Sequence, residues 1–309
     1  MWCAPGPSLG PLLFLLYIND INYASNFRLN LFADDSCLSL SDRSILSLEN
    51  NVNLELDKID YWLKVNKLSL NTEKTSYVIF TNRKPNHTFR VHIGNAQLSQ
   101  QSQVKYLGVI LDEKLSWMPH IEALQKKLAS STWALSCLRS LANEKTLRMV
   151  YFALIHSKLC YCISIWGAAA HSKLLKIERL QKRAIRIICN ESYHAHTEPL
   201  FKSQKILKLV DMHTFQIALI VSKYNHGLWR GNFNPEHASS VHSHNTRYAK
   251  EMNFFIPPAS NNIYKRSLSF LGPSVWKDVP ETLKSLHCDA FKQQFKVHLL
   301  NSYVHDHHK

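Results

Sequence analysis

The sequence predicts an α+β fold, because strand-like and helix-like hydrophobic patterns occupy different parts of the chain. Near the N-terminus, apolar residues alternate in two short segments, Leu29–Ala33 and Ser36–Leu40, as is typical of strands. From residue 113 onward, apolar residues recur every three or four positions, as is typical of helices. The chain of 309 residues is 45% hydrophobic, which is enough for a core.

In the N-terminal part, residues 1–112, the hairpin is followed by one helix and three further strands. The helix is predicted over Ser44–Asn66, where six apolar residues form one face. They are Ile45, Leu48, Val52, Leu56, Ile59 and Leu63. The strands are predicted over Thr75–Phe80, Arg90–Gly94 and Lys105–Leu111. We therefore expect an antiparallel sheet backed by helices.

The apolar run Leu12–Ile18 is too short to span a membrane. A spanning helix needs about 20 apolar residues, whereas Asn19 and Asp20 end this run after seven. We predict a buried helix or strand here, and no membrane partner.

Helices are predicted throughout the rest of the chain. Pro119 stands where a helix can begin, and a nearly all-apolar helix follows over Lys145–Trp166. Another helix covers His171–Cys189, and a last amphipathic helix covers Asp289–Ser302. Residues 225–262, rich in His, Asn, Ser and Pro, predict a polar connector. The predicted domains are residues 1–112, a helical domain at 113–200 and a C-terminal helical region at 201–309.

Charge is distributed unevenly along the chain. Residues 1–80 hold 6 Lys or Arg and 9 Asp or Glu, a net charge of −3, whereas residues 81–309 carry +17. A strongly basic region suits a polyanion such as nucleic acid, with solubility or a membrane-surface preference as alternatives. The seven cysteines show no C-x-x-C pair, which favours a reduced, intracellular compartment, nuclear or cytoplasmic.

The most informative motif is Phe32-Ala33-Asp34-Asp35, at the bend between the first two predicted strands. Adjacent carboxylates repel each other, and a divalent cation that binds both relieves the repulsion. Aspartate oxygens suit hard cations such as Mg²⁺. Asp is also a common turn residue, which is the alternative explanation for these four residues alone.

Further motifs in a fixed order favour the metal-binding interpretation. They are Ala4–Phe14, Trp62-Leu63, Asn66–Asn71, Lys74-Thr75, Tyr106–Val109, Tyr151–Trp166, Gln181–Ile187, Asn245–Arg247 and Gly272–Trp276. In this order and at these spacings, the chain resembles the reverse transcriptase of non-LTR (LINE-type) retrotransposons. The resemblance implies a partial palm, an all-α thumb and a C-terminal helical region. It also implies an RNA-directed DNA polymerase, a nucleotidyltransferase that acts on an RNA template and a DNA primer.

The resemblance implies roles for individual residues as well. Asp34 and Asp35 match the catalytic, metal-binding carboxylates, which hold two Mg²⁺ ions in the intact family. Gly6 and Lys74 match residues near the template and the incoming nucleotide. Leu107 and Gly108 match the turn that positions the primer end.

The chain departs from the family pattern in two ways. In the family, a third metal-binding aspartate precedes the Gly-rich stretch, which begins here at Pro5, so we expect that aspartate and the fingers to be absent. Residues 1–19 contain no Asp or Glu that could replace it. Pro5 and Pro7 replace two polar residues that flank Gly6 in the family, and proline has no N–H donor. We therefore expect little polymerase activity from this chain alone.

A basic stripe on the predicted helix His171–Cys189 is the candidate contact to nucleic acid. It consists of Lys176, Arg179, Arg183 and Arg186. Such a stripe can neutralise backbone phosphates, or it is only the solvated face of a bundle helix. Two alternatives to a polymerase therefore stay open. One is a non-catalytic nucleic-acid-binding protein derived from a mobile element, and the other is a decayed remnant without function.

Overall fold

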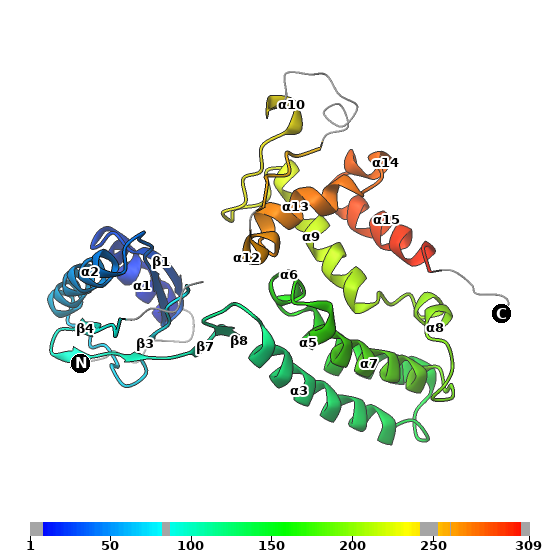
Figure 1. The fold of residues 1–309 in the computed structure, drawn as a ribbon. Helices are drawn as coiled ribbons and strands as arrows, with labels where there is room; N and C mark the ends of the chain where they lie inside the picture. Colours follow the sequence, from blue (N-terminus) through cyan, green and yellow to red (C-terminus); the bar gives the residue numbers. More distant parts are fainter. Residues whose placement is uncertain (1–8, 82–86, 242–252, 260, 304–309) are drawn as a thin grey trace. The chain divides into compact units, whose positions relative to one another are not determined.

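The structure is a computed structural model and describes residues 9–81, 87–241, 253–259 and 261–303 (Figure 1). The chain divides into two compact units. The N-terminal unit comprises Met1–Tyr106 and Leu111–Lys114, and the C-terminal unit comprises Leu107–Ile110 and Leu115–Lys309. Helices and small two-stranded sheets make up the regular structure, which confirms the α+β class. The division into three domains stays a prediction.

The N-terminal unit combines helices with short strands, and the hairpin β7–β8 is divided between the two units. The elements up to this hairpin are α1 (Leu9–Ile18), a 3-10 helix η1 (Asn19–Tyr23), β1 (Arg28–Phe32), β2 (Asp35–Ser39), α2 (Ile45–Val65), β3 (Ser76–Tyr77), β4 (His92–Ile93), β5 (Ala96–Gln97), β6 (Ser99–Gln100), β7 (Gln103–Tyr106) and β8 (Val109–Asp112). Helix α2 begins where the Ser44 hydroxyl accepts the backbone N–H of Ser47. The helix predicted over Ser44–Asn66 is thereby confirmed.

The single antiparallel sheet expected for this unit is wrong. The described strands form separate pairs, β1–β2, β3–β6, β4–β5 and β7–β8, and β3–β6 is parallel. Asn53 of α2 shows one physical reason. Its side-chain amide donates to Arg90 O at 2.9 Å and accepts from His92 N at 3.1 Å. A helix side chain thus satisfies backbone groups that would otherwise be available to a neighbouring strand.

The apolar run near the N-terminus forms helix α1, but most of it is exposed, which corrects the predicted burial. Leu12 is 55% exposed and Leu16 68%, whereas Ile18 is buried. Phe14 and Ile18 reach the core that η1, α2 and the 89–98 segment build. Because the run is apolar all round, its sequence could not show which face packs. No helix in the described ranges is long and apolar enough to cross a membrane.

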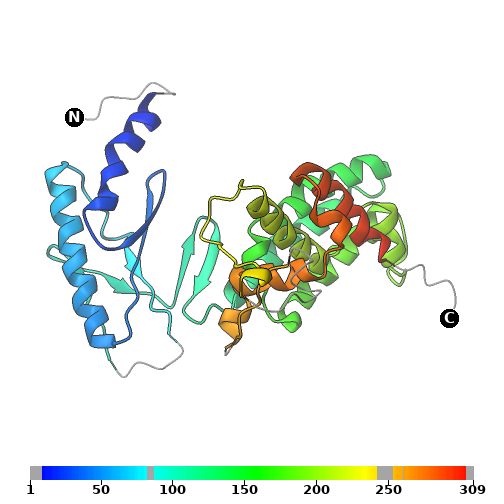
Figure 2. The same cartoon turned by 90° about the horizontal axis from the view of Figure 1, so that it is seen from above.

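The C-terminal unit is almost entirely helical. Its elements are α3 (Met118–Cys137), α4 (Glu144–Tyr151), a π-helical turn η2 (Phe152–His156), α5 (Ser157–Cys160), α6 (Ile163–Trp166), α7 (His171–Ile188), α8 (Glu198–Ser203), α9 (Leu209–Asn225), α10 (Ala238–Val241), α12 (Asn262–Lys265), α13 (Leu268–Lys277), α14 (Glu281–Lys284) and α15 (Cys288–Asn301). Helices α13 and α15 pack along α9 (Figures 1 and 2). Proline at the first turn of α3 and the last helix α15 confirm two sequence predictions.

The segment Lys145–Trp166 is not one helix as expected. It contains α4, the π-helical turn, α5 and α6, with a break at Tyr161 and Cys162. Cys162 adopts a left-handed backbone with φ of 52°. The indole of Trp166 donates to Tyr161 O at 2.8 Å, which satisfies a carbonyl that the break leaves outside the helical ladder. No Gly or Pro stands at the break, so no residue signal indicated it in advance.

Helices α3 and α7 run parallel and side by side. Near their beginnings, the Lys173 amine donates to Ser116 O at 3.2 Å, and near their ends, Arg139 donates to Asn190 Oδ1 at 2.8 Å. Figure 1 shows the two helices along each other over their length. Hydrogen bonds at both ends therefore fix how the two helices are aligned.

Candidate functional site

The acidic motif forms the tip of the hairpin β1–β2, as predicted. The register pairs Phe32 with Asp35, so Ala33 and Asp34 make a two-residue turn. Ala33 takes the left-handed backbone, φ 52°, that such tight turns require of at least one residue. Asp35 belongs to strand β2 and not to the turn itself.

Both carboxylates are exposed to solvent. Leu29 and Leu31 of β1 pack toward the core, so Asp35, opposite Phe32, lies on the other face of the hairpin. Neither Asp34 nor Asp35 has a hydrogen-bond or ion-pair partner among the described residues. Their oxygens are therefore available to a hard cation such as Mg²⁺, which takes carboxylate ligands. No group of three or more His, Cys, Asp or Glu that could hold a metal occurs in the described ranges.

Tyr106, which begins the motif Tyr106–Val109, is a neighbour of this hairpin, and the sequence did not predict that proximity. Burial and the nearby Cys37 and Asp35 raise the pKa of the Tyr106 phenol above its ordinary value. Cys37 lies on the same face of β2 as Asp35, because side chains alternate along a strand. Burial raises the pKa of the Cys37 thiol as well. The only available signal was the position of Tyr106 directly before Leu107-Gly108.

Lys74 lies in a turn that Asn71 fixes. The Lys74 backbone N–H donates to Asn71 Oδ1 at 3.1 Å, and the Thr75 hydroxyl donates to Asn71 O at 2.8 Å. The Lys74 side chain is exposed and has no partner in the described part of the chain. Gly6, together with Pro5 and Pro7, lies outside the described residues.

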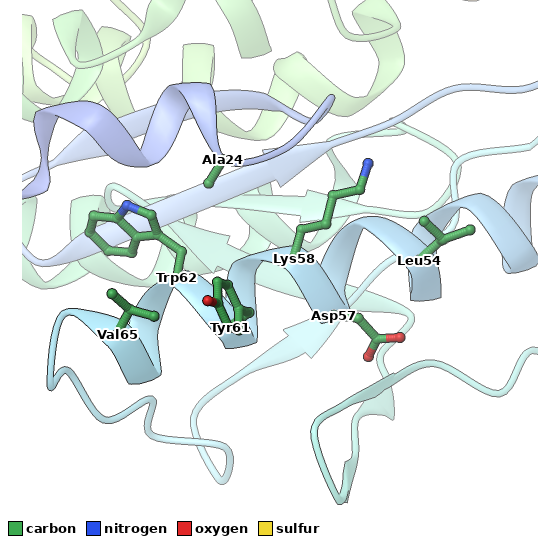
Figure 3. Close-up of a pocket in the computed structure, with 7 residues that line it drawn as sticks. All are labelled: Ala24, Leu54, Asp57, Lys58, Tyr61, Trp62 and Val65. Atoms are coloured by element: carbon green, nitrogen blue, oxygen red, sulfur yellow. The ribbon is translucent and has the colours of Figure 1, made fainter.

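A groove of about 600 Å³ lies between α2 and Ala24, and none of the predicted site residues lines it (Figure 3). Its lining residues are Ala24, Leu54, Asp57, Lys58, Tyr61, Trp62 and Val65. Tyr61 is 72% exposed there, so the groove is shallow. No residue of the acidic hairpin lines this groove, so the groove is a separate feature of the N-terminal unit.

Leu107 and Gly108 form the two-residue turn between β7 and β8, with φ of 44° and 81°. The segment Lys105–Leu111 is thus two strands and a turn, where the sequence predicted one strand with a turn motif inside it. The Tyr161 hydroxyl donates to Leu107 O at 2.5 Å. A Cβ on Gly108 would lie 3.3 Å from the Tyr161 ring. Glycine therefore meets both a backbone and a space requirement here.

Three residues of the C-terminal unit support this turn, a role that sequence reasoning did not assign to them. They are His120, Tyr161 and Trp166. His120 Nδ1 accepts the Ile110 N–H at 3.4 Å, and burial with nearby Lys127 lowers the pKa of His120. A lowered pKa favours the neutral ring, which alone can accept at Nδ1. His120 also contacts the buried Trp166 ring, with centroids 5.9 Å apart.

The four residues of the basic stripe differ in exposure on α7, and their predicted contact to nucleic acid stays a prediction. Lys176, Arg179 and Arg183 are exposed and form no ion pair within the described ranges. Arg186 differs, because it donates to Ala195 O at 2.8 Å and lies 5.8 Å from the centre of the Tyr193 ring. We call Lys176, Arg179 and Arg183 the α7 ridge. Arg186 holds the following loop, and its predicted contact to nucleic acid stays a prediction.

Comparison with known proteins identifies relatives over most of the chain. A Drosophila melanogaster protein named "Probable RNA-directed DNA polymerase from transposon X-element" is 26% identical over 268 residues, which cover 83% of this chain and 27% of that protein. A second, from transposon BS of the same species, is 29% identical over 73% of this chain and 26% of its own length. The RNA-directed DNA polymerase from mobile element jockey is 26% identical over 67% of this chain and 24% of its own.

The chain spans about a quarter of the length of these curated relatives. No family model and no solved structure matches it. The matched relatives share one description, that of polymerases encoded by mobile elements, and the match extends over both compact units. By sequence, this chain is a relative of the RNA-directed DNA polymerases of non-LTR retrotransposons.

Proposed function

We propose that this chain supplies the C-terminal part of the palm and the thumb of an RNA-directed DNA polymerase. The observation that carries the proposal is the pair of exposed, unpartnered carboxylates, Asp34 and Asp35, at a two-residue hairpin turn of the described chain. Structural turns favour one Asp for its local hydrogen bonds, and neither carboxylate makes one here. Two exposed carboxylates held side by side without protein partners can both turn their oxygens to one hard cation.

The proposed reaction is template-directed nucleotide addition. The 3′ oxygen of the primer attacks the α-phosphate of the incoming nucleotide, and pyrophosphate leaves in line. Divalent ions, when bound, neutralise the charge that develops on the attacking and leaving oxygens. Asp34 and Asp35 would hold the metal, and Lys74 would contact the nucleotide phosphates together with Gly6. The Leu107–Gly108 turn would position the primer end.

The α7 ridge would bind the backbone of the template and primer. Three cations on one helix face can neutralise phosphates and release counterions, so that binding weakens as salt rises. Such contacts carry no sequence information. The supporting observation is that these three side chains are exposed, whereas the opposite face of α7 is buried.

Primer extension on an RNA template with Mg²⁺ tests the catalytic part of the proposal. Little extension is expected from this chain alone, and Asp34→Asn should reduce it further, by on the order of a thousandfold, because stabilisation by a metal is worth several kcal/mol. Asp57→Asn, which changes an exposed carboxylate on α2, is the matched control and should extend as the wild type does. RNA binding should be the same in all three proteins. Unchanged extension by Asp34→Asn would refute the assignment of this carboxylate.

A second candidate function is nucleic-acid binding without catalysis. The observation that favours it is that the described ranges contain no third ligand beside Asp34 and Asp35. Salt-sensitive RNA binding by the wild type that Asp34→Asn leaves unchanged, with no divalent cation bound at the hairpin, would support this candidate over the polymerase.

A further inference from the structure

A second group of basic side chains lies in the C-terminal unit, on elements other than α7. Lys296 and Lys292 stand one turn apart on α15, Arg148 lies on α4, and Lys205 follows α8. We call these four residues the Lys296 cluster. None of them forms an ion pair within the described part of the chain. The pKa of Lys296 is lowered by the charges of Arg148, Lys205 and Lys292. Among the described residues, no carboxylate acts on this pKa.

Arg148 is held in place within the cluster. Its Nε and one terminal nitrogen donate to Gln204 O at 3.4 and 3.3 Å, and its guanidinium lies 4.8 Å from the centre of the Phe152 ring. These interactions fix Arg148 beside the residue that precedes Lys205. The Arg148 side chain is therefore already ordered, so its remaining guanidinium donors can bind a ligand with little further loss of conformational entropy.

The backbone around the cluster is irregular in two places. The π-helical turn η2 directly follows α4, and such turns are rare and frequent at functional sites. Lys205 has φ of 53°, at the helix end where Ile206 N donates to Phe201 O at 3.0 Å. Glycine is the usual residue in that position. A lysine there carries a conformational cost, and it places a positive charge next to Arg148.

The cluster is electrostatically unfavourable as it stands. Lys296 is half-buried, and burial together with Arg148, Lys205 and Lys292 lowers the pKa of its amine below the ordinary value. Nearby Cys160 does not compensate, because burial raises the pKa of its thiol and keeps it protonated at neutral pH. The Cys160 Sγ instead lies 3.3 Å from His156 Nε2. Glu144, one turn before Arg148 on α4, is a carboxylate beside the cluster, and its Oε1 accepts the Gln204 amide at 2.6 Å. The four cations outnumber this one carboxylate, and a bound anion would offset the remaining positive charge.

We propose that the Lys296 cluster binds a phosphate group of a nucleic-acid backbone, as a second binding surface in addition to the α7 ridge. The chemistry fits because a fixed arginine fork and mobile lysine amines match phosphate oxygens. This inference rests on the proposed nucleic-acid function and extends it to a surface made by α4, α8 and α15. A free phosphate ion would be bound by the same chemistry, and the test below distinguishes it from a backbone phosphate.

The test is fluorescence anisotropy with a single-stranded RNA oligonucleotide over a range of salt concentrations. The variant is Lys292→Gln with Lys296→Gln, and the matched control is Lys265→Gln with Lys277→Gln on α12 and α13, which removes the same charge. For the cluster variant, the slope of log K against log salt should fall by about 0.7 for each phosphate that the cluster no longer neutralises. The control should keep the wild-type slope, and Lys292→Arg with Lys296→Arg should restore it.

A thermal unfolding measurement separates binding from a structural role. Because the cluster repels itself, the glutamine variant should unfold at the wild-type temperature or above it while it binds RNA more weakly. If that variant loses its helical circular dichroism, the exposed single change Lys292→Gln carries the same test.

The remaining outcomes separate this inference from the proposed function. If the wild type does not bind RNA, the proposed function fails. If Arg179→Gln with Arg183→Gln weakens binding but the cluster variant keeps the wild-type slope, the inference is overturned and the function stands. If the cluster variant keeps the wild-type RNA affinity and salt slope but no longer binds inorganic phosphate alone, the cluster holds a free phosphate and the assignment to the backbone is wrong.

Discussion

At Gly108, two physical demands meet on one residue. Its backbone has φ of 81°, and the space that a Cβ would occupy is 3.3 Å from the Tyr161 ring. The sequence motif predicted a turn here, since Leu107-Gly108 follows strand-like residues. It could not predict that a tyrosine more than fifty positions later would close over the turn, because that packing depends on the break at Tyr161 and Cys162. The turn was thus predictable from local sequence, whereas its tertiary support was not.

Replacing Gly108 by alanine should therefore lower the free energy of unfolding more than the same replacement at a glycine that has positive φ but no close neighbour. Gly227 has φ of 67° with no atom within 4 Å of its added Cβ, so Gly227→Ala measures the backbone cost alone. That cost is about 1–2 kcal/mol. Gly108→Ala should exceed it, as measured by urea unfolding of both variants. Equal costs would show that the packing of Tyr161 against Gly108 has no energetic weight.

Glu49 gives the N-terminal unit a pH-dependent interaction. Its carboxylate is hydrogen-bonded to the His87 ring and accepts the Arg90 N–H at 2.9 Å, and these bonds lower the pKa of Glu49 below 4.5. The folded pKa is thus below the unfolded one. The stabilisation is therefore fully present above about pH 4.5 and disappears as pH falls through the folded pKa.

In the Glu49→Gln protein, the free energy of unfolding should consequently fall less than in the wild type as the pH is lowered. The measurement is the urea midpoint between neutral and strongly acidic pH for the wild type, Glu49→Gln and the control Glu73→Gln, an exposed glutamate in a turn. At neutral pH, Glu49→Gln should be the least stable of the three. If the urea midpoint of Glu49→Gln changes with pH as that of the wild type does, Glu49 is not the source of this pH dependence.

At the scale of elements, the sequence predicted periodic segments well and breaks poorly. Helices α2 and α15 appear where their apolar spacing placed them, because one packed face imposes the 3.6-residue period. The segment Lys145–Trp166 is apolar on nearly every side, so its pattern could not show a π-helical turn or a break. Likewise, the two-residue strands β5 and β6, which no predicted strand covers, are too short to leave an alternating pattern.

The β7–β8 hairpin can be improved by one substitution. Both turn residues have positive φ, a conformation in which Asn-Gly is strongly preferred and leucine is strained. Leu107→Asn should stabilise the protein by about 0.5–1 kcal/mol, since the accepting Leu107 carbonyl is unchanged. Thermal unfolding against the wild type measures this. A decrease in stability would mean that the leucine side chain contributes more than its backbone costs.

Helix α7 depends on one buried amide. Gln181 Nε2 donates to Leu207 O at 2.9 Å and to the Tyr151 hydroxyl at 3.2 Å. Gln181→Ala should destabilise the protein by about 2–4 kcal/mol, because it leaves a cavity and an unsatisfied buried carbonyl. The neighbouring exposed change Lys182→Ala should stay within about 0.5 kcal/mol of the wild type. Chemical denaturation compares the two, and similar effects would contradict the role of this amide.

For the whole molecule, charge asymmetry is the feature that the sequence shows most clearly. Residues 1–80 carry −3 and residues 81–309 carry +17, which favoured an acidic metal-binding part and a basic nucleic-acid-binding part. The acidic hairpin and the exposed α7 ridge are where the sequence placed them. The Lys296 cluster could not be foreseen, because Arg148, Lys205 and Lys296 are separated by tens of residues and meet only through tertiary packing. The exposure of α1 could not be predicted from the sequence either.

The central claim is that the Asp34–Asp35 hairpin binds a divalent metal. The most direct test replaces Mg²⁺ by Fe²⁺ with ascorbate and peroxide, so that hydroxyl radicals cut the chain beside the bound ion, and maps the cuts by mass spectrometry. We predict cuts next to Ala33–Asp35 that excess Mg²⁺ suppresses and that Asp34→Asn with Asp35→Asn removes, whereas Asp57→Asn leaves them unchanged. Cuts that persist in the double variant, or no cuts near the hairpin, would contradict the claim.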